Sequence, residues 1–188
     1  MKKIFGYINA LYLYAVKYYY TAKHKGLQVE GKIILGKRVK LVLGKGAVLT
    51  AKGNLTLQDD VQIRVRAGAE VRFGKDCYLN RSSTVNAHKS ILFGDGVMLG
   101  ENVKIYDNDH TITGNHIERR MFNVSPVEIR DGSWIANNAV VLKGSVMGPN
   151  TVVGALTLVS GTLDANALYL GVPARKMKKL EPEEKQEQ

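Results

Sequence analysis

Residues 93–110 read FGDGVM, LGENVK and IYDNDH, three consecutive six-residue units that each begin with an apolar residue. The first two units share glycine in second place, an acidic residue in third place and valine in fifth place. The third unit departs from this pattern, because Asp109 and His110 occupy its last two places. A repeat of six residues is typical of chains that wind into stacked coils of β-strand.

The same period returns after residues 111–126, with mostly small residues in fifth place. Its first positions are Ile129, Ile135, Val141, Met147, Val153 and Val159, and its fifth positions are Ser133, Ala139, Ser145, Thr151, Thr157 and Leu163. Small residues suit the corners of a narrow prism, where an inward side chain has little room. An α-helix would spread the first positions around its circumference, because its period differs from six. The sequence therefore predicts an all-β fold, a parallel β-helix of hexapeptide repeats.

From residue 29 to residue 72 the repeat is looser, because intervals of eight residues interrupt the intervals of six. Apolar residues between Ile63 and Phe73 alternate with other residues, as they do in a strand. We interpret this region as coils with two-residue bulges, with Val, Leu and Ile inside and Lys and Arg outside. A solenoid buries its core between successive coils, so one array can use most of the 188 residues.

The net charge of +10 is unevenly distributed. Residues 1–75 carry 15 Lys and Arg against 4 Asp and Glu, whereas residues 76–188 carry 12 against 13. Two interpretations of the basic half are open: it faces an anionic acceptor or anionic lipid, or it only solvates the outer side of the coils. Nucleic acid is not expected as a partner, since the basic coils lack interleaved aromatic residues for base stacking.

Residues 1–26 are predicted to form a separate amphipathic helix, rich in tyrosine and flanked by lysine. Its apolar run, residues 4–16, is shorter than the roughly 20 residues that cross a bilayer, and its repeated tyrosines argue against a signal peptide. The helix either caps the solenoid, contacts a subunit or lies at a membrane surface. We expect a cytoplasmic protein, and the presence of a single cysteine, Cys77, is compatible with that location. Peripheral contact with an anionic membrane is a further hypothesis.

The predicted organisation has three parts. Residues 1–26 form the helix, residues 27–175 form the β-helix domain, and residues 176–188 form a tail that is first basic and then acidic. Residues 111–126 are predicted to leave the domain as one ejected loop, directly after His110. Long loops in a compact domain are often functional.

Five motifs, taken together, resemble the left-handed β-helix acyltransferases, and among them the sugar and polysaccharide O-acetyltransferases such as galactoside and maltose acetyltransferase. They are DNDH at 107–110, the loop ending in Pro126, SWIAN at 133–137, VGALT at 153–157 and GVPAR at 171–175. The resemblance covers residues 73–180. It implies a left-handed parallel β-helix, acetyl-CoA as cofactor, a sugar or glycan acceptor, a place in polysaccharide biosynthesis, and a homotrimer with active sites between subunits.

The resemblance also implies roles for individual residues. His110 matches the catalytic histidine, Asn80 the asparagine of the acceptor region, and the backbone amide of Asn137 the donor to the oxyanion. The residues assigned to the acceptor are Trp134, which matches an indole near the site, Phe122 and Asp107. Phe122 has the alternative role of anchoring the loop, and either Asp107 or Asp109 is a candidate to orient His110.

Positions that line coenzyme A in the family fall on Ala136, Ala155, Thr157, Ser160, Arg175 and Lys178, and no metal site is implied. A guanidinium fork such as that of Arg175 is well shaped for phosphate. Three segments depart from the family pattern: Ala136 stands where glycine is usual, Ala155-Leu156-Thr157 where Ala-Gly-Ser is usual, and Ser160-Gly161 where Thr-Lys is usual. These departures affect the cofactor contacts and leave the histidine unchanged.

The chemistry of such a site is direct transfer to a hydroxyl. The hydroxyl must lose its proton as it attacks the thioester, and a neutral imidazole can take that proton at cellular pH. A backbone N–H at a tight turn can stabilise the oxyanion that forms. No covalent acyl-enzyme is needed, so the lack of a nucleophilic Ser–His or Cys–His motif is consistent with this reaction.

Two other functions are open for the same fold. One is a γ-type carbonic anhydrase, which places zinc on three histidines from neighbouring subunits, and His88, His110 and His116 are available for this role. The other is a non-catalytic scaffold. Outside the catalytic assignment, we interpret His24, His88 and His116 as surface residues, while Arg119 and Arg120 either grip an anionic acceptor or solvate the loop.

Overall fold

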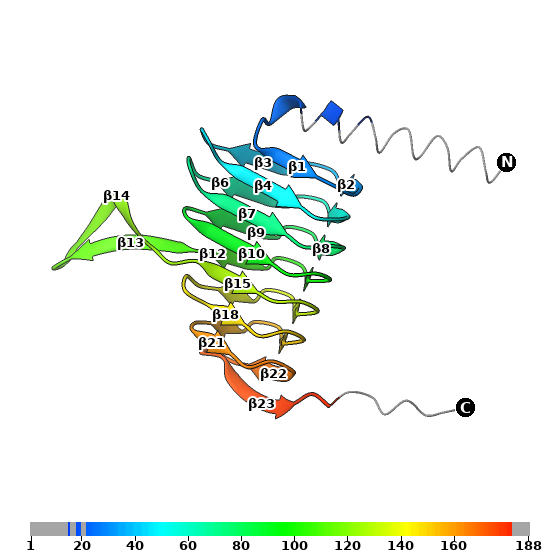
Figure 1. Ribbon diagram of the computed structural model, residues 1–188. Coiled ribbons are helices and arrows are strands. Elements are labelled where there is room, and N and C mark those ends of the chain that lie inside the picture. Colours follow the sequence, from blue (N-terminus) through cyan, green and yellow to red (C-terminus); the bar gives the residue numbers. More distant parts are fainter. Residues whose placement is uncertain (1–14, 16–17, 20–21, 182–188) are drawn as a thin grey trace, which may run out of the picture.

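The computed structural model describes residues 15, 18, 19 and 22–181. From Leu27 onward the chain winds into stacked coils, and successive strands of each coil enter three parallel sheets that form the sides of a prism (Figure 1). The helix predicted for residues 1–26 falls largely on residues outside the described part, as does the acidic end of the tail, and the membrane contact based on that helix stays a prediction. Within the described residues no helix is long and apolar enough to span a bilayer.

Sheet A contains seven strands: β1 (Leu27–Val29), β4 (Val48–Ala51), β7 (Glu70–Phe73), β10 (Ser90–Phe93), β15 (Val127–Ile129), β18 (Val146–Met147) and β21 (Thr162–Leu163). Sheet B contains eight: β2 (Ile33–Leu35), β5 (Leu55–Leu57), β8 (Cys77–Leu79), β11 (Met98–Leu99), β16 (Trp134–Ile135), β19 (Val152–Val153), β22 (Ala167–Leu170) and β23 (Arg175–Lys179). Sheet C contains six: β3 (Lys40–Leu43), β6 (Gln62–Val65), β9 (Thr84–Ala87), β12 (Lys104–Tyr106), β17 (Val140–Val141) and β20 (Leu158–Val159). The predicted β-helix fold is confirmed.

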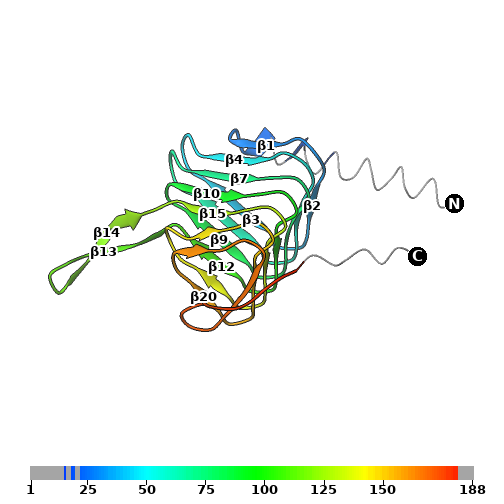
Figure 2. The same cartoon turned by 60° about the horizontal axis from the view of Figure 1, so that its bottom comes forward.

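The ejected segment is itself a β-hairpin, made of β13 (Asn108–Thr113) and β14 (His116–Val124). It leaves the prism between β12 and β15 and projects away from it (Figures 1 and 2). The sequence predicts only an ejected loop here, but Gly114-Asn115 directly after Thr111-Ile112-Thr113 is a hairpin signal. At the other end, residues 175–179 pair antiparallel with β22, so the basic part of the predicted tail continues sheet B.

Coil length changes along the prism. Register partners lie 22 residues apart in the first coils, then 20, then 36 where the hairpin is inserted, and finally 18 and 16. The extra residues of the early coils lengthen the strands of sheets A and C, since β3, β4, β6, β7, β9 and β10 have four residues each and β17, β18, β20 and β21 have two. We call residues 27–107 the wide coils and residues 127–170 the narrow coils.

The core is a set of stacked ladders, and it contains the residues that the period predicts. Every first position of the narrow coils is 0% exposed, and the fifth positions are 4% exposed or less. Hydroxyls at the fifth positions are satisfied by backbone: Ser133 Oγ donates to Gly148 O at 3.1 Å and Thr151 Oγ1 donates to the same oxygen at 2.7 Å. Small size and a nearby carbonyl together allow polar residues inside these corners.

The corner between sheets B and C repeats one backbone conformation in successive coils. One residue per coil has a positive φ between 56° and 62°, namely Arg38, Asp60, Ser82, Asn102, Asn138 and Leu156. Successive coils also approach closely here, because a Cβ on Gly100 would collide with the backbone and side chain of Asn137. This B–C corner thus keeps the same shape from the wide to the narrow coils.

Candidate active site

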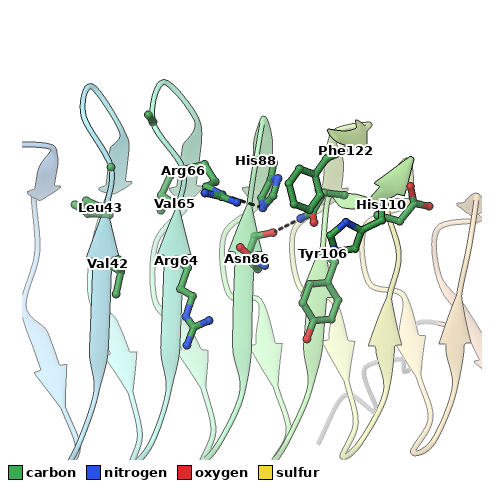
Figure 3. A pocket seen from close by; sticks show the side chains of 14 residues that line it. Val42, Leu43, Arg64, Val65, Arg66, Asn86, His88, Tyr106, His110 and Phe122 are labelled. Carbon is green, nitrogen blue, oxygen red and sulfur yellow. Dashed lines mark hydrogen bonds between the residues drawn. The ribbon is translucent and has the colours of Figure 1, made fainter. Parts of the chain in front are cut away.

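A groove of about 780 Å³ lies where the hairpin meets the wide coils, at the corner between sheets C and A (Figure 3). Its floor is the outer face of sheet C, and its wall is the root of the hairpin. The lining residues that matter below are Val42, Arg64, Arg66, Asn86, His88, Tyr106, His110 and Phe122.

His110 lies on β13 and is exposed to the groove. Its Nδ1 lies 3.2 Å from the carbonyl oxygen of Glu118 on the opposite hairpin strand. Because a carbonyl oxygen only accepts, we assign the proton to Nδ1, which leaves Nε2 with its lone pair. Neither Asp107 nor Asp109, the candidates proposed from the sequence, makes this contact, so a backbone oxygen orients the histidine.

Phe122 joins His110 to the prism. It pairs with His110 in the hairpin register, and the two ring centroids are 4.6 Å apart. The ring of His88 meets Phe122 edge-on at 4.4 Å, and the guanidinium of Arg66 lies 5.5 Å from the same ring centroid. Phe122 therefore packs against both the histidine and the wide coils, which is the anchoring role, and it also lines the groove.

His88 is the second histidine of the groove, and it forms a hydrogen bond with Arg66. Arg66 Nε donates to His88 Nε2 at 3.3 Å, so this nitrogen is unprotonated. Partial burial lowers the pKa of His88, and the positive charge of Arg66 lowers it further. The sequence had suggested a surface residue, but His88 is a neutral, partly buried member of the groove.

Asp107 is fully buried and holds a turn of the preceding coil. Its carboxylate accepts the backbone N–H groups of His88, Lys89 and Ser90 at 2.7–2.8 Å. We therefore interpret Asp107 as the anchor of that turn and no longer as a residue that contacts the acceptor. Asp109 is exposed and forms an ion pair with Lys143 at 3.3 Å.

The outer face of sheet C adds residues to the groove that the sequence analysis did not single out. Val42, Arg64, Asn86 and Tyr106 stand next to one another in register on four successive strands. Their spacing of 22 and 20 residues would have revealed this row, if the coil length had been known. Without it, Arg64 and Arg66 are only two members of the basic half, for which both interpretations stay open.

A second group of predicted residues lies at the B–C corner, on another part of the prism. Asn80 follows β8, and Ala136 and Asn137 follow β16. Glu101 N–H donates to Asn137 Oδ1 at 2.9 Å, but 18 residues further on Ala155 has no side-chain oxygen to repeat this bond. As a result, the N–H of Asn137 has no hydrogen-bond partner among the described residues. This is the amide expected to stabilise an oxyanion.

The other predicted residues are divided between exposed and buried positions. Trp134 is 44% exposed on sheet B, and Arg175 and Lys178 are exposed on β23. Thr157 is 1% exposed and its hydroxyl accepts from Gly171 N–H at 3.2 Å, so its side chain is already engaged. Ala155 is exposed at the B–C corner, whereas Ser160 lies on the turn from sheet C to sheet A. One chain therefore brings His110 together with Phe122, and not with Asn80, Trp134 or Asn137.

The part of the chain that the structure describes contains no group of three His, Cys, Asp or Glu side chains arranged to hold a metal ion. His116 lies at the hairpin tip, where it pairs with Thr113, while His88 lies on the prism.

Comparison with known proteins finds acetyltransferases, although no family model matches the chain. Galactoside O-acetyltransferase of Lactococcus lactis is 30% identical over 113 residues, which is 60% of this chain and 55% of that protein. Galactoside O-acetyltransferase of Escherichia coli is 25% identical over 118 residues, 63% of this chain and 58% of that protein. The chain thus spans less than two thirds of the length of these relatives.

Among solved structures, an N-acyltransferase from Bacillus cereus in complex with dTDP-4-amino-4,6-dideoxyglucose and coenzyme A has a TM-score of 0.75. It is 19% identical, and the match covers 86% of this chain and 88% of that one. A likeness at this identity concerns the fold. The resemblance to hexapeptide-repeat acyltransferases that the sequence indicated is confirmed.

Proposed function

We propose that this protein is a coenzyme A-dependent O-acetyltransferase that moves an acetyl group from acetyl-CoA to a hydroxyl of a sugar or glycan precursor. The observation that carries the proposal is His110, whose Nδ1 is fixed by a backbone carbonyl and whose Nε2 is free at the edge of a groove. The similarity to galactoside O-acetyltransferases supports a sugar as the acceptor.

In this reaction His110 Nε2 takes the proton of the attacking hydroxyl. The hydroxyl oxygen forms an ester bond to the acetyl carbon, the carbon–sulfur bond of the thioester breaks, and the proton passes from Nε2 to the departing sulfur. The Nδ1 donor bond to Glu118 keeps the ring in the tautomer that this step needs and stabilises the imidazolium while it holds both protons. The free N–H of Asn137 is our candidate donor to the oxyanion.

Acetyl-CoA supplies the activated acetyl group, and the residues at the C-terminal end of the prism fit its chemistry. Arg175 and Lys178 place exposed positive charge on β23, which suits phosphate groups. Ala136 and Ala155 leave the B–C corner open to a chain that passes close to the backbone. Thr157 contributes through its fold, since its hydroxyl is bonded to Gly171.

A homotrimer with active sites between subunits would unite the two groups of residues. Outward residues of sheet B form one row in register, Ile34, Thr56, Tyr78, Met98, Trp134, Val152 and Leu168. This row is mostly apolar, and Met98 is 48% exposed, as is expected of a face that a second copy covers. The hairpin carries exposed Ile112 and Met121, which suit the same contact.

The decisive experiment measures acceptor-dependent release of coenzyme A from acetyl-CoA by wild type, His110→Ala and His116→Ala. We expect His110→Ala to lower kcat by roughly 100- to 10,000-fold, because it removes the general base. The His116→Ala control, which changes the hairpin tip, is expected to keep full activity. Equal activity of His110→Ala and wild type would refute catalysis by His110. Absence of both coenzyme A release for every sugar and coenzyme A binding in calorimetry would favour a scaffold.

The shared site has its own test. Co-expressed His110→Ala and Asn80→Ala chains, each inactive alone, are expected to regain activity in mixed oligomers, because some sites then receive both native residues. Sedimentation of the wild type would give the subunit number independently. No recovery in oligomers shown to be mixed would contradict a site built from two subunits.

A further inference from the structure

Given the proposed function, on which this inference rests, we propose that the groove beside His110 binds an acceptor that carries an oxyanion, a phosphate or a carboxylate, and that Arg64 and Arg66 bind this group. The acceptor would then be an anionic sugar. Its reactive hydroxyl lies at His110, and its charged group lies over the wide coils.

Arg64 is the first of the two cations. It is exposed on β6, and its Nη2 donates a hydrogen bond to Gln62 Oε1, a neutral acceptor, at 3.1 Å. Within residues 22–181 it makes no ion pair. By contrast, two arginines of sheet A each form an ion pair with the glutamate two residues earlier. They are Arg72, on β7, and Arg130, directly after β15. Arg64 has Gln62 in that place, so its charge is left for a ligand.

Arg66 is the second cation, and its position is fixed from one side. Its Nε donates a hydrogen bond to His88, and its guanidinium lies against the ring of Phe122. In the described part of the chain no hydrogen bond occupies its two terminal nitrogens. Figure 3 shows Arg66, His88 and Phe122 gathered at the top of the groove, with Arg64 on the neighbouring part of the sheet face. A neutral His88 orients this guanidinium without adding a charge of its own.

The groove contains no carboxylate that would neutralise these two charges. Asp109 is the acidic residue that lines it, and its carboxylate is paired with Lys143. Two guanidinium groups in one groove repel each other, and an oxyanion relieves this repulsion while accepting bidentate hydrogen bonds. Charge steering by the basic half of the chain would act in the same direction.

The distance along the groove also fits. Arg64 lies two strands from Tyr106, the residue of sheet C next to the hairpin. At about 4.8 Å per strand, the charged group would lie roughly 10 Å from the level of β12, about the length of one sugar ring with a substituent. A sugar can therefore reach from His110 to Arg64 without leaving the sheet face.

The test compares three acceptors, a neutral hexose, its 1-phosphate and its uronic acid, in wild type, Arg64→Gln, Arg64→Lys and Arg72→Gln. Wild type is expected to show a lower KM for the charged acceptors than for the hexose. Arg64→Gln should raise the KM for the charged acceptors by about 10- to 100-fold, the effect of a charge-assisted hydrogen bond, and leave the KM for the hexose unchanged. Arg64→Lys should recover part of the loss, and Arg72→Gln, on another face, should behave as wild type.

Binding of the hexose 1-phosphate and of the uronic acid, measured by calorimetry without acetyl-CoA, separates this inference from the proposed function. Binding that is lost in Arg64→Gln would support the anion site even if no acetyl transfer occurs. Acetyl transfer with equal KM for neutral and charged sugars in wild type and Arg64→Gln would overturn the inference and leave the proposed function standing. Absence of both binding and transfer for the two charged sugars would also overturn it. Preference for one charged sugar identifies the oxyanion as phosphate or carboxylate.

Discussion

The wide and the narrow coils use the same corner between sheets B and C, but they differ at the corner between sheets C and A. The narrow coils repeat every 18 or 16 residues with strands of two or three residues in sheets A and C, while the wide coils take 22 or 20 residues with strands of three or four residues. The groove, with its histidines and its two arginines, lies along the wide coils and at the root of the hairpin. The residues predicted for the cofactor lie mainly on the narrow coils and on β23.

Under the proposed function, this difference would let one repeat bind two substrates. A uniform repeat keeps the backbone of the B–C corner in one conformation, which suits a cofactor bound largely through backbone. Extra residues in two of the three sheets change only the C–A corner, so the acceptor groove can vary while the stacking of coils is kept. Three substitutions would break or sharpen this comparison.

The largest effect is expected for Asp107→Ala, at the junction of wide and narrow coils. The change leaves three backbone N–H groups of residues 88–90 without acceptors. A hydrogen bond to a charged group contributes about 1.5–3 kcal/mol, so the loss of three should lower the free energy of unfolding in urea by more than about 3 kcal/mol. Asp95→Ala is the matched control, because Asp95 accepts from Lys75 N–H at an exposed corner. An equal loss in both variants would mean that the junction is no more critical than any other turn.

A smaller effect is expected for thiol reactivity, which reports how readily each type of coil opens. Burial raises the pKa of Cys77, in the wide coils, to about 11. At pH 8 its alkylation should therefore be at least about 100-fold slower than in the urea-unfolded chain, because little thiolate is present and access is blocked.

Thr151 occupies the corresponding corner of a narrow coil, so Cys77→Ser/Thr151→Cys moves the thiol to an equivalent place. We expect the thiol at position 151 to react faster than Cys77, since two-residue strands form fewer ladder hydrogen bonds per coil. A slower reaction at position 151 would show that the narrow coils are the more stable part.

The smallest effect is expected for Leu156→Asn at the B–C corner. Leu156 has a φ of 59° and is 69% exposed, and this left-handed conformation costs a leucine about 1 kcal/mol more than an asparagine. The variant should be more stable by about that amount in thermal or urea unfolding. Asn138→Leu, one coil earlier at φ 61°, should be destabilised. If Leu156 also contacts acetyl-CoA, the more stable variant will have a higher KM for it.

Much of the fold could be predicted from the sequence, because a six-residue period is a local pattern. The buried positions of the narrow coils, such as Ile135 and Ser133, follow directly from it. The hairpin was missed as a structured element, since its pairing depends on a two-residue turn within a segment that breaks the period. The number of residues in each coil could also not be predicted, so neither could the position of Arg64 beside Asn86.

The candidate site was predictable only in part. His110 could be found from its place at the end of a hexad, and Asn137 from the motif around it. The partner of His110 could not be predicted, because Glu118 contributes a backbone oxygen, which every residue type has. The burial of Asp107 was likewise hidden, since an aspartate next to a catalytic candidate has the same letter whether it faces a substrate or holds a turn.

The bond from His110 to the carbonyl of Glu118 has a consequence for how such a protein can change over generations. Because the contact is made by main chain, any residue that keeps the hairpin paired at position 118 also keeps the base in its working tautomer. Exposed positions such as Arg119, Arg120 and Met121 can then drift, and with them the choice of acceptor, while the proton chemistry is inherited intact. Under the proposed function, the hairpin would thereby hold the general base in place while its exposed residues change the choice of acceptor.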